Sequence, residues 1–173
     1  MKDLRWLTKE FLEKRYSYDP STGVLTSRLT KKPIQTKRGR ESNYYCVNLR
    51  REGIRHSLAA HTIIFIIMTG KHPETTLDHI NGNGLDNRWC NLRSASHSQQ
   101  ALNRNIRRDN SSGYRGVSLE KSTGLYRAYV DHNGVRKNLG KFKSKHDAAR
   151  AYNEYATTVF DLKFIRLNEI KED

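Results

Sequence analysis

Two Asn-Gly pairs follow one another at residues 81–84, near the middle of the chain. Asn-Gly is the strongest short-range signal for a tight turn, because both residue types accept the positive φ that such turns require. Residues 75–80 before the turn predict a strand, and residues 92–95 after it predict a returning strand. The polar segment 96–107 has helical spacing of its few apolar residues. The centre of the chain is therefore expected to fold as strand, turn, strand and helix.

Residues 59–69 are apolar on nearly every face, and Gly70 follows them directly. A glycine at that place is typical of a helix end, so the pattern favours a short buried helix, although its β-branched residues leave a strand open. The longest apolar run, Ile63–Met68, is far shorter than the roughly 18 residues of a membrane span. Because the chain starts without an apolar signal core, we expect a cytoplasmic protein without a membrane partner.

The N-terminal part predicts one helix and three strands. Residues 3–16 have helical spacing, the turn signal at 19–23 precedes a strand at 24–27, and two strands span residues 44–58 around a turn at Glu52-Gly53. The basic stretch 31–40 has little apolar content. It is either a mobile loop or an arm that orders on a phosphate backbone, and the sequence favours neither.

The last third of the chain predicts a three-stranded sheet packed on one helix. The strands are expected at 114–119, 125–131 and 135–142, and the turn Asn133-Gly134 joins the last two. A helix begins after Ser144, and its apolar face is formed by Ala148, Tyr152, Tyr155 and Val159. With the central elements, this pattern predicts an α+β fold.

The chain carries a formal net charge of +14. Residues 1–58 contribute +8, residues 59–110 contribute +2 and residues 111–173 contribute +4. Such a surplus suits a polyanion, above all nucleic acid, whose condensed counterions are released on binding. We expect the basic flanks to hold nucleic acid, with Lys37, Arg38 and Arg40 among the contacts. The two cysteines form no CxxC pair, which fits a reducing compartment and gives no reason to expect structural zinc.

Asp78 and His79 stand side by side just before the central turn. Phosphodiester hydrolysis needs a base that activates water and a hard cation that neutralises charge on the phosphate. The ordinary pKa of histidine, about 6.5, suits the base, and a carboxylate suits Mg²⁺. Adjacent side chains of a strand point to opposite faces, so both residues can serve one site only if the strand ends or bends there.

Residues 61–103 resemble the HNH endonuclease family, in the branch found in phage and intron homing endonucleases. The resemblance is carried by Asp78-His79-Ile80-Asn81-Gly82-Asn83, Leu85-Asp86-Asn87-Arg88 and Asn91-Leu92-Arg93. It implies a ββα-metal finger, two strands and a helix around one divalent cation, in a hydrolase that cleaves DNA. Origin in a phage or mobile element is implied as well.

The resemblance also implies a role for individual residues. His79 would be the general base, Asp78 a metal ligand, and Asn91 would orient His79 through a hydrogen bond. The second metal ligand of the family, an Asn or His, falls at Gln100, and His97 is near enough to replace it. The cation implied is Mg²⁺, with Mn²⁺ as the alternative.

Other residues of this segment keep two readings. Arg93 either touches the scissile phosphate or pairs with Asp86, and His61 either packs under the finger or contacts DNA. The remaining polar residues of the turn are expected to cap it: Asn83, Asp86 and Asn87.

Residues 113–168 resemble the plant ethylene-response-factor DNA-binding domain. The matching residues are Tyr114-Arg115-Gly116-Val117, Tyr126-Arg127-Ala128, Leu139-Gly140-Lys141-Phe142, Ala148-Ala149-Arg150-Ala151-Tyr152 and Leu167-Asn168. That family docks its sheet in the DNA major groove, which implies DNA contacts from Arg115, Tyr126, Arg127, Tyr129, Arg136 and Lys137. Asn138 stands where a Trp is usual, so sequence preference is not transferable.

Four segments are expected: a basic DNA-gripping region at 1–58, the nuclease core at 59–108, a linker at 109–113 and the DNA-binding domain at 114–170. The leading hypothesis is a metal-dependent DNA endonuclease that acts as a monomer and takes no small-molecule substrate. The alternative is a sequence-specific DNA-binding regulator with an inactive finger, because Gln100 departs from the family pattern. Basic charge alone also permits RNA binding.

Overall fold

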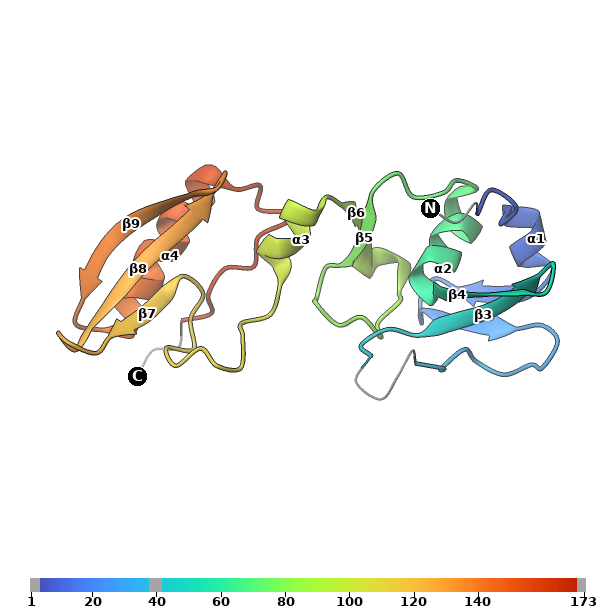
Figure 1. Ribbon diagram of the computed structural model, residues 1–173, viewed down its shortest axis with the longest axis horizontal. Helices are drawn as coiled ribbons and strands as arrows, with labels where there is room; N and C mark the ends of the chain where they lie inside the picture. Colours follow the sequence, from blue (N-terminus) through green and yellow to red (C-terminus); the bar gives the residue numbers. More distant parts are fainter. Residues whose placement is uncertain (1–3, 38–41, 171–173) are drawn as a thin grey trace. The chain divides into compact units, whose positions relative to one another are not determined.

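The computed structural model describes residues 4–37 and 42–170, which form two compact units with the boundary between Ser98 and Gln99. The first unit is built from the following elements (Figure 1): α1 (Lys9–Glu13), β1 (Tyr16–Asp19), β2 (Val24–Ser27), β3 (Cys46–Arg51), β4 (Ile54–Ala59), α2 (Ala60–Thr69), β5 (Thr76–His79), the 3-10 turn η1 (Trp89–Asn91) and β6 (Leu92–Ala95). The helix α3 (His97–Asn103) crosses the boundary, and the second unit continues with β7 (Val117–Glu120), β8 (Leu125–His132), β9 (Val135–Phe142) and α4 (Lys145–Val159).

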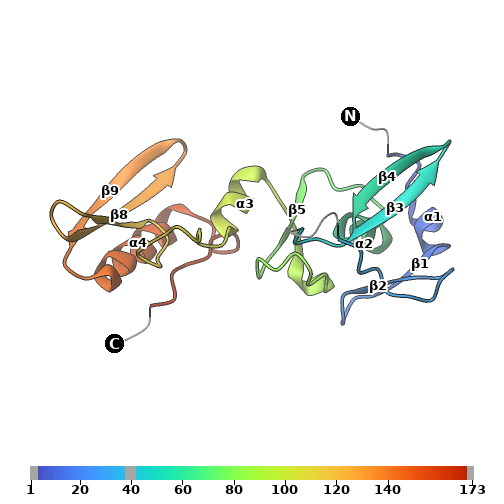
Figure 2. The same ribbon diagram turned by 60° about the horizontal axis from the view of Figure 1, so that its bottom comes forward.

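All strand pairs among the described residues are antiparallel. In the first unit β1 pairs with β2, β3 with β4, and β5 with β6, which gives three separate hairpins (Figure 2). The second unit holds one three-stranded sheet in the order β7-β8-β9. The predicted α+β class is therefore confirmed, and so is the order strand, strand, helix in the centre of the chain.

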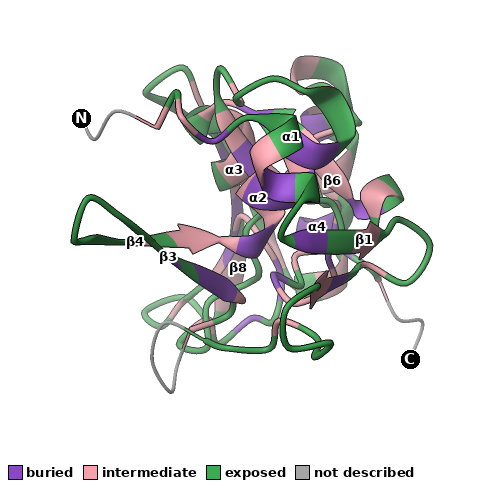
Figure 3. Ribbon diagram, turned by 90° about the vertical axis from the view of Figure 1, so that its right-hand side faces the viewer, coloured by how far each residue is buried: buried purple, intermediate pink, exposed green. Residues whose placement is uncertain are grey.

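The apolar segment forms a helix, as the glycine after it indicated. Gly70 adopts the left-handed conformation with φ of 72° and donates its backbone N–H to Ile66 O at 2.8 Å. Ile63 and Ile64 are fully buried, and Figure 3 shows α2 largely buried while the turn between β3 and β4 is exposed. The core of the first unit forms around α2 and takes side chains from α1 and from the β1–β2 and β3–β4 hairpins. No helix of the described residues is long and apolar enough to cross a membrane.

The N-terminal helix is shorter than the sequence predicted. It spans Lys9–Glu13, because the Thr8 hydroxyl accepts a hydrogen bond from Phe11 N at 3.2 Å and so begins the helix there. The strand β1, which the sequence analysis did not predict, starts at Tyr16. Its pairing with β2 outweighs the helical spacing of the preceding residues.

The described part of the basic stretch packs beside β2. Ile34 N donates to Leu25 O at 2.7 Å, and Lys37 forms an isolated bridge with Tyr45. Arg38 and Arg40, two of the predicted DNA contacts, lie outside the described residues.

The second unit buries one face of its sheet against α4. Ala128 of β8 packs with Ala148 and Ala149 of the helix, and Val130 packs with Tyr152. The first strand begins at Val117, later than predicted, because the Ser112 hydroxyl donates to Val117 O at 2.8 Å and fixes the preceding residues as a turn. Residues 109–113 lie inside this unit, and Ser112 is buried.

We predict that Ile64→Ala lowers the free energy of unfolding of the first unit by about 2–5 kcal/mol, the usual cost of removing a buried isoleucine. Both tryptophans, Trp6 and Trp89, lie in this unit, so urea denaturation followed by tryptophan fluorescence reports on it alone. Met68→Ala is the matched control, because the Met68 side chain is exposed. An equal loss in both variants would contradict the position of the core.

Candidate functional site

The β5–β6 hairpin places Asp78 and His79 where the strand ends. Asp78 pairs with Arg93 and His79 pairs with Leu92 in the strand register. After His79 the chain leaves the ladder through one last bond, from Ile80 N to Asn91 O at 2.9 Å. His79 is only 4 % exposed, whereas Asp78 is half-buried. The strand end that the two side chains require for a common site is therefore present.

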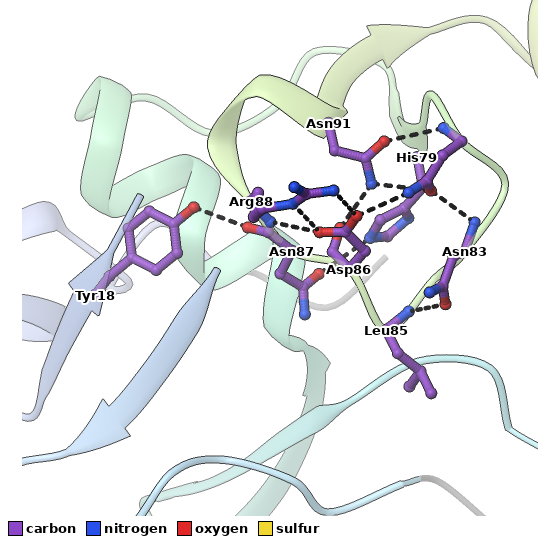
Figure 4. A network of polar contacts seen from close by, with 9 residues as sticks. Tyr18, His79, Asn83, Leu85, Asp86, Asn87, Arg88 and Asn91 are labelled. Atoms are coloured by element: carbon purple, nitrogen blue, oxygen red, sulfur yellow. Dashed lines mark hydrogen bonds and ion pairs between the residues drawn. The ribbon is translucent and has the colours of Figure 1, made fainter. Parts of the chain in front are cut away.

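Residues 80–91 form a loop that is held by its own side chains (Figure 4). Gly82 takes φ of 71° and donates its N–H to His79 O at 2.8 Å. Asn83 Oδ1 accepts from Leu85 N, and Asp86 Oδ1 accepts from Arg88 N. The prediction that Asn83 and Asp86 cap the turn is confirmed.

Asn91 ties the two ends of this loop together. Its Oδ1 accepts from Asn81 N at 2.9 Å, and its Nδ2 donates to Asp86 O at 2.7 Å and to Asn81 Oδ1 at 3.0 Å. The hydrogen bond that the sequence analysis expected from Asn91 to His79 is made by Asn87 instead. The sequence does not show which asparagine accepts the hydrogen bond from His79, because Asn87 and Asn91 both follow His79 within one loop.

Asn87 fixes the orientation of the His79 ring. Its Oδ1 lies 3.0 Å from His79 Nε2, and both residues are buried. An amide oxygen only accepts, so Nε2 carries the hydrogen and Nδ1 holds the lone pair. Burial lowers the pKa of His79 below its ordinary value. The hydrogen bond to Asn87 and the charges of Asp78 and Asp86 act in the opposite direction and raise this pKa by less. The ring is therefore neutral near pH 7 and can accept a proton.

Two further rings lie against that of His79, and the sequence indicated only His61. The centroid of His61 lies 5.2 Å from that of His79, and the centroid of Tyr44 lies 5.7 Å away. Burial, with a smaller contribution from His79, lowers the pKa of His61 to about 4. His61 thus packs under the loop as a neutral ring. The Tyr44 ring lies directly against the loop at Gly84. A Cβ at Gly84 would lie 2.6 Å from Tyr44 Cε1, so the absence of a side chain there allows this approach.

Asp78 pairs with Arg93 across the hairpin. Arg93 Nη2 and Nε lie 2.6 and 3.0 Å from Asp78 Oδ2, and each side chain is 14 % exposed. The alternative that Arg93 pairs with Asp86 is wrong, since Asp86 pairs with Arg88 at 2.6 Å. Strand register explains the difference, because Asp78 and Arg93 stand directly opposite each other.

Asp78 offers a carboxylate oxygen to a divalent cation near the end of β5. Within residues 4–37 and 42–170, no group of three or more His, Cys, Asp or Glu side chains could hold a metal ion. Mg²⁺ keeps several waters and is bound through one or two carboxylates, which Asp78 can supply. Gln100, the predicted second ligand, lies half-buried on α3, and His97 is the exposed first residue of that helix.

The three-stranded sheet separates the predicted DNA contacts onto two faces. Arg127 and Tyr129 of β8 alternate with the buried Ala128 and Val130, so they point away from α4. Tyr126 packs on the core. Lys137 pairs with Val130 in the register, and its Nζ lies 4.5 Å from the Tyr155 ring of α4.

Tyr126 and Lys137, two of the predicted DNA contacts, therefore lie on the face of the sheet toward α4. Arg136 lies on the outer face, over the Tyr129 ring at 4.2 Å, with its Nε 2.8 Å from Asp131 Oδ1. Arg127 lies 3.7 Å from the Glu120 carboxylate. Three of the predicted contacts thus share one surface: Arg127, Tyr129 and Arg136.

Arg115 precedes β7 and turns toward the chain segment before it. Its guanidinium donates to Arg104 O, and its backbone N–H donates to Asn168 Oδ1 at 2.7 Å. Burial lowers the pKa of Arg115 from its ordinary value, with a further contribution from Arg166. The side chain borders a hollow of about 480 Å³ that Arg104 and Arg107 also line.

Comparison with known proteins identifies one segment of the chain. The model of the HNH endonuclease family matches residues 58–102. An uncharacterized HNH endonuclease of Acanthamoeba polyphaga mimivirus is 32 % identical over 102 residues, which cover 58 % of this chain and 52 % of that protein. The chain thus spans about half the length of this relative.

A solved structure of DNA binding and cleavage by the HNH homing endonuclease I-HmuI aligns with 90 % of this chain and 82 % of its own, at 17 % identity and a TM-score of 0.43. The family match covers β5, the loop that holds His79, β6 and most of α3. Residues 58–102 are therefore identified as an HNH endonuclease domain.

Proposed function

We propose that this protein is a DNA endonuclease that hydrolyses phosphodiester bonds of double-stranded DNA, with His79 as the general base. The observation that carries the proposal is the buried His79 ring, which Asn87 holds through Nε2 at 3.0 Å within the HNH endonuclease segment. That arrangement leaves Nδ1 as the proton acceptor.

His79 would take a proton from the attacking water at Nδ1. The ring then becomes a cation, which the Nε2–H···Oδ1 bond to Asn87 and the nearby charges of Asp78 and Asp86 stabilise. In the neutral state, burial among the rings of His61 and Tyr44 disfavours the protonated form. Burial outweighs the other contributions, so His79 rests as a neutral base, and Asn87 and the two carboxylates offset part of the cost of the charge that it takes up.

A divalent cation, Mg²⁺ or alternatively Mn²⁺, would be held by Asp78. Such a cation supplies stabilisation of the charge that develops on the phosphate and the leaving oxygen. Arg93 holds Asp78 in place from the opposite strand. The assignment of Gln100 as the second ligand stays a prediction.

We propose that the second unit binds DNA through the outer face of its sheet, in the manner of the ethylene-response-factor domain that it resembles. Support comes from the grouping of Arg127, Tyr129 and Arg136 on the face away from α4. Arginine is suited to reading guanine, and tyrosine to holding phosphates. We also propose that DNA is contacted by Lys37, Arg93 and Arg115. The proposal further includes that the protein acts as a monomer in the cytoplasm and originates from a phage.

A DNA-binding regulator without cleavage activity is the second candidate. The observation that favours it is the ion pair between Asp78 and Arg93, because both bonds end on the same carboxylate oxygen that could bind a cation. The two candidates differ in one measurement, cleavage of DNA in the presence of Mg²⁺ or Mn²⁺.

We predict that the wild-type protein converts supercoiled plasmid to nicked or linear product in Mg²⁺ or Mn²⁺ and that EDTA stops the reaction. His79→Ala should lower the rate by about 10²–10⁴-fold, the usual contribution of a general base. His72→Ala is the matched control, since His72 is exposed outside the site. Plasmid that stays supercoiled with both metals would favour the regulator, and cleavage by His79→Ala at the wild-type rate would refute the base assignment.

We predict that Arg127→Ala weakens binding to a selected DNA site about fivefold to a hundredfold, as expected for the loss of a base contact of roughly 1–3 kcal/mol. Lys137→Ala removes a charge of the same sign from the opposite face of the sheet and should change the affinity less. Fluorescence anisotropy at one fixed salt concentration measures both. Equal losses would show that charge alone, and not the outer face, determines binding.

A further inference from the structure

The β1–β2 turn is built as a rigid unit, although the proposed chemistry assigns it no role. Asp19 Oδ1 accepts from Ser21 N at 2.9 Å, and Asp19 Oδ2 accepts from the Thr22 hydroxyl at 2.9 Å. The hydrogen bonds from Ser21 and Thr22 lower the pKa of Asp19 to about 2, so the carboxylate stays charged and the turn stays closed.

This turn contacts the loop of residues 80–91, here called the catalytic loop, on both sides of Arg88. The Tyr18 hydroxyl donates to Asn87 O at 2.8 Å, as Figure 4 shows, and Trp89 N donates to Pro20 O at 3.1 Å. Burial, with smaller contributions from neighbouring charges, raises the pKa of Tyr18 to about 12. The hydroxyl therefore keeps its hydrogen at every pH at which the enzyme would act.

Gly23 brings the two backbones into direct contact. A Cβ at this position would lie 2.5 Å from Arg88 N and 2.7 Å from Asn87 C, and φ is +75°. No other residue type fits without moving the loop, because the nearest atoms belong to the backbone. The same asparagine whose backbone touches Gly23 and Tyr18 holds the His79 ring with its side chain.

Asn87 would have space to move without these contacts. It borders a cavity of about 160 Å³ that Gly23 and Leu85 also line. Packing alone therefore does not fix Asn87 on that side, and the directional bond from Tyr18 carries more of the restraint.

We infer that Tyr18 and Gly23 are positioning residues for His79, which they orient through Asn87. Neither residue touches the reacting atoms. The inference rests on the proposed function, in which His79 is the general base. It gives the N-terminal hairpin a part in the reaction that is separate from gripping DNA.

The test compares Tyr18→Phe with Tyr16→Phe. Tyr16 is a buried tyrosine on the same strand and the same face, and no hydrogen bond among the described residues joins its hydroxyl to the catalytic loop. Three quantities are measured in the full-length protein: the single-turnover nicking rate at saturating protein, DNA affinity in EDTA, and the His79 ring signals in long-range ¹H–¹⁵N NMR spectra.

We expect Tyr18→Phe to lower the nicking rate about threefold to tenfold, the effect of losing one hydrogen bond. The DNA affinity should stay within about twofold of wild type, because the hydroxyl acts on Asn87 and not on DNA. The His79 ring nitrogen signals should shift, and Tyr16→Phe should change none of the three quantities. The inference is wrong if Tyr18→Phe leaves the ring signals and the rate unchanged, or if the rate falls only in proportion to affinity.

A second pair of variants tests the backbone contact. Gly23→Ala and Gly53→Ala introduce the same side chain at nearly the same φ, +75° and +76°, but the Cβ at Gly53 meets nothing within 4 Å. We expect Gly23→Ala to nick about 10-fold to 100-fold more slowly than Gly53→Ala, since small displacements of a reacting group are costly. Equal rates in the two variants would overturn the role of Gly23.

Failure of the proposed function is distinguishable from failure of this inference. If the wild-type protein nicks no DNA with either metal, the nuclease assignment fails. The His79 ring signals still decide whether Tyr18 orients the histidine, because they are recorded without DNA or metal. A shift in Tyr18→Phe that Tyr16→Phe lacks supports the orienting contact, and its absence refutes it.

Discussion

The buried amide of Asn91 closes the loop on which the position of His79 depends. A loop of this length buries several backbone groups that cannot reach a strand partner, and such groups are costly unless they are hydrogen-bonded. Asn91, at the end of the loop, supplies one acceptor and two donor bonds, which reach Asn81 at its beginning and Asp86 in its middle. An apolar residue of similar size would leave those groups unpaired, so the amide is required by the loop itself and not by contact with the histidine.

Two other elements pack against the closed loop, the helix α2 and the β1–β2 turn. His61 of α2 packs against the His79 ring, and Phe65 of the same helix lies 6.1 Å from the Trp89 ring. The isoleucines on the other faces of α2 pack against the N-terminal hairpins. One short apolar helix therefore joins the N-terminal residues to the candidate site in a single core. A substitution in that core that shifts α2 would also shift His61, which contacts the His79 ring directly.

The sequence predicted the elements whose signals are local and missed the partners that depend on tertiary contacts. The helix α2 followed from its apolar run and Gly70, and the β5–β6 hairpin from the Asn-Gly pairs. The choice of Asn87 over Asn91 as the partner of His79 depends on how the loop closes, which no local pattern encodes. The strand β1 was hidden because helical spacing runs up to Tyr16, and only its pairing with β2 shows where the helix must stop.

Strand parity determines which of the candidate site residues share a face. Neighbours on a strand face opposite sides, so Asp78 and His79 can meet at one site only because β5 ends at His79. The same rule applies to Arg136 and Lys137, but β9 continues to Phe142, and the two side chains stay on opposite faces of the sheet. A pair of basic residues within a continuing strand therefore gives one surface contact and not two. Arg136 belongs to the outer face with Arg127, whereas the stem and charge of Lys137 cover the Tyr155 ring.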